Sequence, residues 1–300
     1  MKTALKRILV LPGILSVLSC SVFHKAGPDL SKTAWVHGAA DCKQNIDPPI
    51  QVVQYDQNTW ILRESKCVHY EGPFMFLFIG RQKALLMDDG ATADAKKFPL
   101  RVVVDSLIDN WEKANHTQVA LTVAHTHSHG DHIAGDGQFK NRPNTTVVGL
   151  KVEDVTAYFQ LQNWPLQTGQ IDLGDRELDI IPIPGHHATC VAVYDHETRI
   201  LLSGDSFYPG RLYIKDWQNF KASTQRLTDF ATSHKISWIL GNHIEISKTP
   251  GVDYPIGSTF QPDEHILPLT VKDLVLLNDT LKGMDKPARK VLNDFIIYPV

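Results

Sequence analysis

The sequence predicts an α+β fold of the αββα type, in which two mixed β-sheets pack face to face and helices cover both outer surfaces. Short runs of β-branched and aromatic residues occur along the chain in two groups. Segments with helical periodicity lie between these runs and after them. The chain has 300 residues, 43% of them hydrophobic and 21% charged, which is typical of a protein with a large buried core.

The first group of predicted strands precedes residue 125. It comprises Trp60–Leu62, Phe74–Ile79, Ala84–Met87 and Val119–Ala124. A helix is expected between the last two strands, because apolar residues recur there at i, i+4, i+7, i+8 and i+11, on one helical face. These residues are Leu100, Val104, Leu107, Ile108 and Trp111.

The second group of predicted strands follows residue 145. It comprises Thr146–Leu150, Leu178–Ile183, Cys190–Tyr194, Ile200–Leu202 and Ile236–Leu240. Residues 194–199 lie between two of these strands and predict a hairpin turn. Two further helices are expected over Phe220–His234 and Val271–Leu281, the second with Thr270 as its N-cap and Gly283 at its end.

Residues 1–20 have the pattern of an export signal. Three basic residues precede an apolar stretch that is shorter than the roughly 20 residues of a membrane-spanning helix. The end of the segment, Val17 to Cys20, resembles the lipobox of bacterial lipoproteins, in which the cysteine receives lipid. The alternative is ordinary cleavage with release of the mature protein. Both alternatives predict a bacterial protein that is exported, either periplasmic or anchored to a membrane through Cys20.

The predicted export affects what is expected of the other cysteines, because disulfides persist outside the cytoplasm. Cys42 and Cys67 could form a disulfide outside the cytoplasm, although their spacing alone does not decide it. Cys190 would then remain free, in an apolar stretch where a cysteine usually serves packing.

The charge of the chain disfavours a nucleic-acid partner. The formal net charge is -3, and it becomes more negative when the basic leader is removed. Such a chain has no basic excess for a phosphate backbone. A small-molecule substrate is the expected partner, and the oligomeric state is left open.

Histidines cluster just after the predicted strand that ends at Ala124. The chain has 14 histidines, and four of them, His125, His127, His129 and His132, fall within eight positions. On an extended chain, side chains two apart point the same way, so His127 and His129 can reach one cation as neutral imidazoles. Asp131 and His132 follow a turn at Gly130 and are expected to face a neighbouring point. One short loop could therefore serve two metal ions.

The segment His127-x-His129-x-Asp131-His132 resembles the H-x-H-x-D-H motif of the metallo-β-lactamase-fold hydrolases. Other segments resemble the family in the same order. They are Leu86 to Gly90, with Asp88 as the supporting aspartate, Pro184 to His186, Leu202 to Asp205, and Leu240 to His243. The resemblance covers about residues 55–245, and each motif follows a predicted strand.

This resemblance implies a binuclear metal centre. His127, His129 and His186 are the implied ligands of the first ion, and Asp131, His132 and His243 those of the second, with Asp205 as the bridging carboxylate. Zinc is the expected metal, with iron or manganese as alternatives. His125 and His187 are expected to lie beside the ligands and not to bind metal.

The implied activity is hydrolysis of a carbonyl substrate by a metal-bound hydroxide, which Asp131 orients or deprotonates. The substrate bond is a thioester, lactone, ester or β-lactam-type amide. Some true β-lactamases of the fold have a cysteine where Asp205 stands, so the aspartate favours the glyoxalase II, lactonase and thioesterase branches. Tyr208 follows Asp205 by three residues, a spacing found in related lactonases, and either faces the substrate or packs in its loop.

Three alternative functions belong to other classes. A mononuclear iron dioxygenase of the persulfide type shares several of the ligands, and phosphodiesterases share the fold. A metal-binding protein without catalytic activity is the third. The expected organisation is a signal peptide over 1–20, an extended lead-in over 21–54, the catalytic domain over 55–245 and a C-terminal helical extension over 246–300, packed on that domain.

Overall fold

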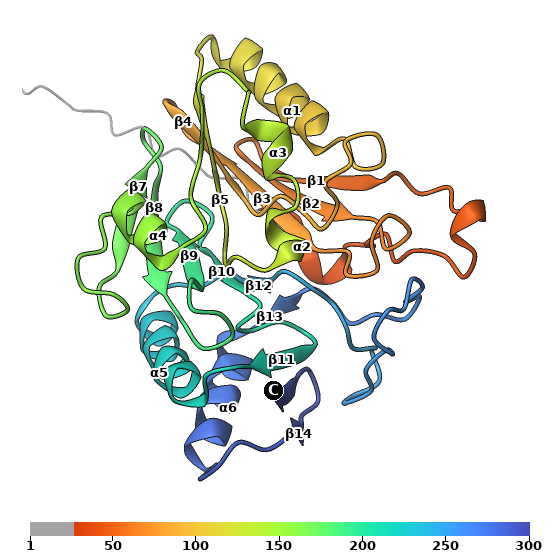
Figure 1. The fold of residues 1–300 in the computed structure, drawn as a ribbon, viewed down its shortest axis with the longest axis vertical. Helices are drawn as coiled ribbons and strands as arrows, with labels where there is room; N and C mark the ends of the chain where they lie inside the picture. The colour runs from red at the N-terminus through yellow and green to blue at the C-terminus, as the bar shows by residue number, and fades with distance from the viewer. Residues whose placement is uncertain (1–26) are drawn as a thin grey trace, which may run out of the picture.

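The computed structural model describes residues 27–300. The predicted signal peptide and Cys20 lie outside the described residues, so export and lipid attachment stay predictions. Within the described part, no helix combines the length and the apolar character that crossing a membrane requires. Figure 1 shows two β-sheets at the centre of the molecule, with the longer helices on the outside.

The first sheet has six strands in chain order. They are β1 (Ile50–Asp56), β2 (Thr59–Glu64), β3 (Phe74–Ile79), β4 (Lys83–Met87), β5 (Ala120–Ala124) and β6 (Thr145–Val147). The first four pair in antiparallel fashion, whereas β4, β5 and β6 are parallel, so the sheet is mixed. The crossover from β4 to β5 is made by α1 (Leu100–Asn115), as the apolar periodicity predicts.

The second sheet also has six strands, in the order β13-β12-β10-β9-β8-β7. They are β7 (Gly169–Asp172), β8 (Glu177–Pro182), β9 (Val191–Asp195), β10 (Ile200–Gly204), β12 (Trp238–Gly241) and β13 (Pro268–Leu269). The parallel pair β10 and β12 is connected through α5 (Trp217–Ser233), and the other pairs are antiparallel. The predicted hairpin between β9 and β10 is confirmed.

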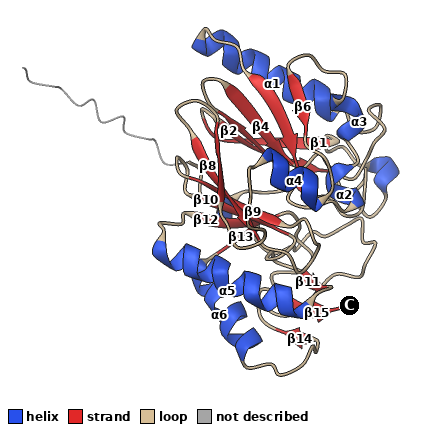
Figure 2. Cartoon of the chain, turned by 60° about the vertical axis from the view of Figure 1, so that its left-hand side comes forward, coloured by secondary structure: helices blue, strands red, loops and turns tan. Residues whose placement is uncertain are grey.

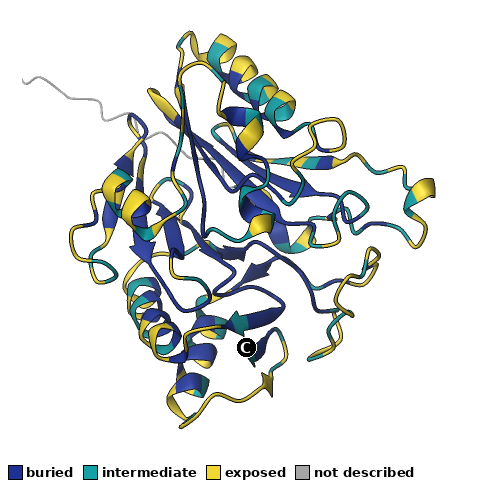
Figure 3. Ribbon diagram, viewed as in Figure 1, coloured by how far each residue is buried: buried dark blue, intermediate teal, exposed yellow. Residues whose placement is uncertain are grey.

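Three apolar clusters define the layers. One lies between the two sheets, with Phe76 and Leu202 among its members. A second packs α1 against the first sheet, and a third packs α5 and α6 (Val271–Lys282) on the second sheet. Figure 2 shows the longer helices outside the strands, and Figure 3 shows that the central strands are mostly buried while the longer helices expose one face. The predicted αββα arrangement is confirmed.

Short helices and a small third sheet complete the fold. The helices are α2 (Gly130–Ile133), α3 (Asp136–Phe139) and α4 (Val152–Tyr158), with the 3-10 turns η1 (Leu30–Lys32) and η2 (Cys42–Gln44) near the N-terminus. The sheet pairs β11 (Arg211–Ile214) with β15 (Ile296–Pro299) in parallel and β15 with β14 (Lys290–Val291) in antiparallel fashion. The last strand of the chain therefore lies beside the segment that follows Asp205.

Two segments differ from the sequence prediction. Residues 50–54, expected in the lead-in, form most of β1, which pairs with β2 along its whole length. The region 246–300 is not only helical, because it also contributes β13, β14 and β15. Its helix α6 has the predicted limits, since Thr270 accepts a hydrogen bond from the Asp273 backbone N–H and Gly283 is the C-cap.

The cysteines are arranged as the export hypothesis allows. Cys42 and Cys67 form a disulfide, and Cys190 is free and buried. The disulfide ties the N-terminal segment to the loop between β2 and β3. That loop contributes to the region of the candidate site.

Candidate metal centre

All seven candidate ligands lie at one end of the two sheets, five of them in loops and Asp131 and His132 in the short helix α2. His127, His129, Asp131 and His132 follow β5, and His186 lies between β8 and β9. Asp205 comes directly after β10, and His243 directly after the parallel strand β12. Because neighbouring parallel strands end at the same edge of a sheet, their following residues converge there.

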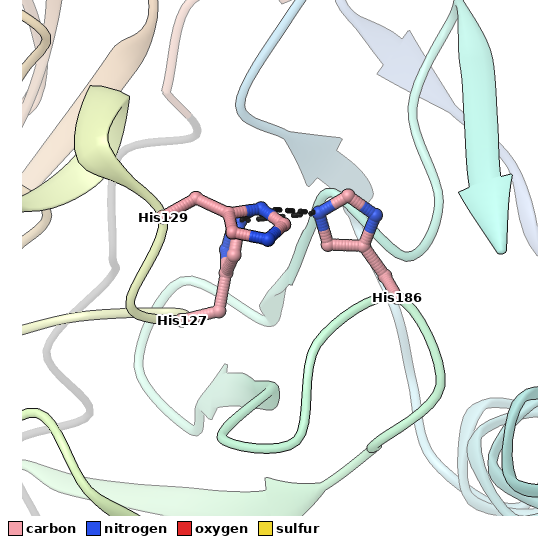
Figure 4. A group of neighbouring side chains, drawn as sticks. All are labelled: His127, His129 and His186. Atoms are coloured by element: carbon pink, nitrogen blue, oxygen red, sulfur yellow. Dashed lines mark hydrogen bonds between the residues drawn. The ribbon is translucent and has the colours of Figure 1, made fainter. Parts of the chain in front are cut away.

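The first group consists of three imidazoles. Nε2 of His127 lies 3.0 Å from Nδ1 of His129, and Nε2 of His186 lies 3.2 Å and 3.0 Å from the same two atoms. Figure 4 shows His127 and His129 facing His186 across the group. Nitrogens about 2.0 Å from a tetrahedral zinc ion are roughly 3.3 Å apart, so these three atoms fit the ligand positions of such an ion.

The second group combines two imidazoles with two carboxylates. Asp131 Oδ2 lies 3.4 Å from Nε2 of His132 and 3.3 Å from Nε2 of His243. The two Nε2 atoms are 3.4 Å apart, and each lies 3.4 Å from an oxygen of Asp205. All four ligand atoms are within 4.8 Å of one another, which leaves one common point for a cation.

Asp205 lies between the two groups. Its Oδ2 is 3.4 Å from His132 Nε2 in the second group and 3.8 Å from Nε2 of both His127 and His186 in the first. A single carboxylate thus faces both candidate cation positions. This is the place that a bridging ligand would occupy.

The protonation of the imidazoles differs between the two groups. Burial lowers the pKa of His127, His129 and His186, so these rings are neutral and keep a free lone pair. Burial acts in the same direction on His132 and His243, but there the carboxylates of Asp205 and Asp131 prevail and raise the pKa. Without a metal ion these two rings therefore hold protons beside the carboxylates, and a cation bound here would displace those protons.

Backbone carbonyls orient two of the imidazoles. The His186 Nδ1–H donates to the Tyr213 carbonyl over 2.7 Å, and the His243 Nδ1–H donates to the Glu71 carbonyl over 3.3 Å. A hydrogen bond at Nδ1 fixes the tautomer whose Nε2 lone pair points into the site. Sequence reasoning missed both partners, because any residue type can supply a carbonyl.

Asp88 supports the site from beneath, as the resemblance implies. It is fully buried, and its Oδ2 lies 3.5 Å from Nδ1 of His132. It also accepts hydrogen bonds from the Thr126 backbone N–H over 2.8 Å and from Nδ2 of Asn242 over 2.7 Å. Asn242 had no assigned role in the sequence, yet it joins the loop after β12 to the loop after β4.

His125 and His187 lie beside the two groups. Nε2 of His125 is 3.1 Å from Asp136 Oδ1, in a separate cluster that includes Asp89. Nδ1 of His187 is 2.9 Å from the Thr189 hydroxyl, and its ring packs on that of His129. Neither ring belongs to the two groups that hold the seven predicted ligands.

Tyr208 is fully buried, and its hydroxyl is committed within the protein. The hydroxyl contacts the Arg211 carbonyl and lies 3.0 Å from Glu245 Oε2. Burial and the Glu245 charge raise its pKa well above the usual value. This geometry favours the packing alternative, and the catalytic role of Tyr208 stays a prediction.

The Tyr208→Phe variant distinguishes the two roles. If the hydroxyl only packs, kcat on the best substrate should stay within a factor of about 3 of the wild-type value, and the free energy of unfolding should fall by about 1 kcal/mol because one buried hydrogen bond is lost. Urea unfolding and steady-state kinetics measure both quantities. A fall in kcat of about 100-fold or more with unchanged stability would assign the phenol to catalysis.

Comparisons with known proteins agree with this geometry. The family model described as "Metallo-beta-lactamase superfamily" matches residues 121–274, just over half of the chain, and that range contains all seven candidate ligands. The chain is 29% identical over 128 residues to a hydroxyacylglutathione hydrolase of Ectopseudomonas mendocina, which covers 39% of this chain and 46% of the relative. It is 33% identical over 88 residues to the acyl-coenzyme A thioesterase MBLAC2 of Gallus gallus, with 27% and 31% covered.

Solved structures show the same fold. A metallo-beta-lactamase from Pontibacter korlensis superposes with a TM-score of 0.51 and 17% identity, covering 78% of this chain and all of that one. The chain spans less than half the length of the two curated relatives above. The extent of the family match, supported by the fold and by the order of the motifs, shows that the chain belongs to the metallo-beta-lactamase superfamily.

Proposed function

We propose that this protein is an exported, metal-dependent hydrolase that holds two zinc ions and cleaves a carbonyl substrate. The observation that carries the proposal is the position of Asp205, whose oxygens face the three-histidine group and the mixed group together. When bound, two zinc ions would supply a hydroxide nucleophile at neutral pH and would polarise the carbonyl. Iron or manganese could occupy the same ligands.

The exposure of the candidate ligands indicates where a substrate can approach the site. The side chain of Asp131 is 23% exposed, whereas those of His127 and His132 are fully buried. His129 is also partly exposed. The site therefore opens to solvent at His129 and Asp131, and Asp131 is placed to orient a water molecule or to accept its proton.

The names of the two relatives favour a thioester among the four substrate bonds considered. One is named as a hydrolase of hydroxyacylglutathione and the other as an acyl-coenzyme A thioesterase. We therefore infer a thioester as the first substrate class to test, before lactones, esters and β-lactam-type amides.

The test measures metal content and substrate range on the purified mature protein. Metal identity and stoichiometry are determined by elemental analysis, and turnover is measured with a thioester, a lactone, a β-lactam and a phosphodiester. Two zinc equivalents with turnover of a carbonyl substrate would support the proposal. A single iron with oxygen uptake and no hydrolysis would overturn it in favour of a dioxygenase, and turnover of the phosphodiester alone would overturn the substrate class.

Export is the second part of the proposal, and it rests on residues 1–20. The disulfide between Cys42 and Cys67 supports it, because such bonds persist in oxidising compartments. Fractionation of bacteria that express the full chain tests it. Recovery in the membrane fraction that depends on Cys20 indicates the lipid anchor, periplasmic recovery indicates release, and recovery in the cytoplasm would contradict export.

A further inference from the structure

A polar cavity of about 260 Å3 borders the candidate metal centre. Its walls include Lys66 and Glu71 from the loop between β2 and β3, Tyr213 from β11, and Gln261 from the loop that follows His243. Two of these residues hold candidate ligands, because the carbonyls of Tyr213 and Glu71 accept the Nδ1–H bonds of His186 and His243. These two carbonyls place the cavity wall against two candidate ligands, so the cavity lies next to the metal centre.

Most charges on the cavity wall are already paired. Arg211 donates from Nη2 to Glu245 Oε1 over 2.9 Å and from Nη1 to Asp253 Oδ2 over 2.9 Å. Its Nε–H donates to the Tyr213 hydroxyl over 2.8 Å. With all these donors engaged, the Arg211 guanidinium is a structural element of the wall and not a free anion receptor.

Lys66 is different, because its ammonium group makes no direct ion pair, and the carboxylates of Glu264, Glu245 and Glu71 act on it only beyond ion-pair distance. The residue is only 2% exposed, and Nζ donates to the carbonyls of Tyr70 and Glu71 over 3.1 Å and 3.2 Å. No carboxylate oxygen among residues 27–300 lies within ion-pair distance of Nζ. An ammonium group has three N–H donors, so one remains for a ligand in the cavity.

Two further observations indicate that the cavity is built for a polar group. The side chain of Gln261 is 4% exposed, and its Oε1 has no hydrogen-bond partner in the described part of the chain. Turned about its last bond, the same amide would present its N–H2 donors to a carboxylate. Burial, reinforced by the charge of Arg63, lowers the pKa of Lys66 to about 8. A buried ammonium without a direct ion pair is costly, and an anion placed beside it would lower that cost.

We propose that this cavity recognises a carboxylate of the substrate through the ammonium group of Lys66. The proposal rests on the proposed function and narrows its substrate class to carbonyl compounds that carry a carboxylate near the scissile bond. A singly charged carboxylate suits the cavity better than a phosphate dianion, because the carboxylates of Glu71 and Glu245 are close by and only one N–H is free.

The first experiment measures binding to the zinc-loaded protein by calorimetry. The probe is succinate, and succinamide is its neutral counterpart. Lys66→Gln keeps a donor for the two carbonyls but removes the charge, and Lys66→Arg keeps the charge. We expect Lys66→Gln to bind succinate at least 10-fold more weakly than the wild type, Lys66→Arg to stay within about 3-fold, and all three proteins to hold the same amount of zinc.

The second experiment compares matched thioesters. Succinyl and butyryl thioesters of one thiol place the carboxylate on the acyl side, and acetyl thioesters of 3-mercaptopropionate and propanethiol place it on the thiol side. The wild type should prefer the charged member of one pair, through a lower KM, and Lys66→Gln should lose that preference. Ser258→Ala, on the same wall, is the control variant and should keep it.

The possible outcomes test the role of the cavity independently of the proposed function. Equal affinity of the wild type and Lys66→Gln for succinate, with equal zinc content, would overturn the role of Lys66 even if thioesters are hydrolysed. If no thioester is hydrolysed, the binding experiment still decides the role of the cavity. If Lys66→Gln does not fold, the wild type alone gives the answer, because a failure to prefer succinate over succinamide would contradict the proposal.

Discussion

Replacement of Asp205 by asparagine should remove one metal equivalent and lower kcat/KM by on the order of 100-fold or more, since loss of even an outer partner of a ligand typically costs 10- to 100-fold. The asparagine keeps the size of the side chain but removes the negative charge. That charge faces Nε2 of His132 and His243 at 3.4 Å and reaches the first group at 3.8 Å. Two cations held close together repel each other, so the second should dissociate first when the bridging carboxylate is lost.

Elemental analysis and steady-state kinetics on the same preparation measure both effects. Asp279→Asn is a matched control, because this aspartate is exposed on α6, and it should retain both metals and full activity. Thermal unfolding checks that Asp205→Asn is folded. Two tightly bound metals with undiminished turnover in Asp205→Asn would exclude the bridging role.

The candidate site could be predicted well from the sequence because its side chains carry a distinctive chemistry. His127, His129, Asp131 and His132 fall within six positions just after an apolar strand, and His186, Asp205 and His243 each follow an apolar run. The structure places all seven in two groups at one end of the sheets.

The partners that hold these side chains could not be predicted in the same way. The carbonyls of Glu71 and Tyr213 have no signature in the sequence, because every residue has one. The environment of Tyr208 depends on Glu245, which lies 37 residues away in the chain. The D-x-x-Y spacing identified the tyrosine but not the direction of its hydroxyl.

The fold was predictable where an element is long and apolar. The strand β3 is buried at every position, and α1 has a clear apolar face, so both follow from pattern alone. The strands β13 and β14 have two residues each, which is too short for any periodicity to be recognised. Strand β1 alternates in burial, but most of it lies in the segment 21–54 that the sequence predicts as an extended lead-in, directly after Pro48 and Pro49.

The second large expected effect concerns the stability of the folded protein. The residues involved lie at the end of the strands opposite to the candidate metal centre. Arg176 and Asp195 form a buried ion pair, with Nη2 to Oδ2 at 2.7 Å and Nε to Oδ1 at 3.0 Å. Arg176 also donates to the Asn58 carbonyl over 2.8 Å and to the Thr59 hydroxyl over 2.7 Å. The pair therefore connects β9 of the second sheet with the start of β2 in the first.

Asp195→Asn should destabilise the protein by about 3 to 5 kcal/mol, because it leaves the buried Arg176 cation with only the longer pair to Glu197 at 3.7 Å. Urea unfolding at pH 7 measures the loss. The control is Asp175→Asn, which removes an exposed pair with Arg81 at 3.8 Å and should change stability by less than about 1 kcal/mol. A loss in Asp195→Asn as small as that of the control would show that the buried pair contributes little.

The pH dependence of this loss identifies its cause. Burial alone would raise the pKa of Asp195, but the charge and hydrogen bonds of Arg176 prevail and lower it. A carboxyl group with a lowered pKa stabilises the folded state above its unfolded pKa of about 3.9, and the contribution disappears as the pH falls through the folded value. The difference between wild type and Asp195→Asn should therefore be constant from pH 5 to 8, in round numbers, and should shrink below about pH 4. Because the pair is remote from the metal centre, folded Asp195→Asn should keep its full metal content, whereas a loss of metal would show that the two ends of the sheets are coupled.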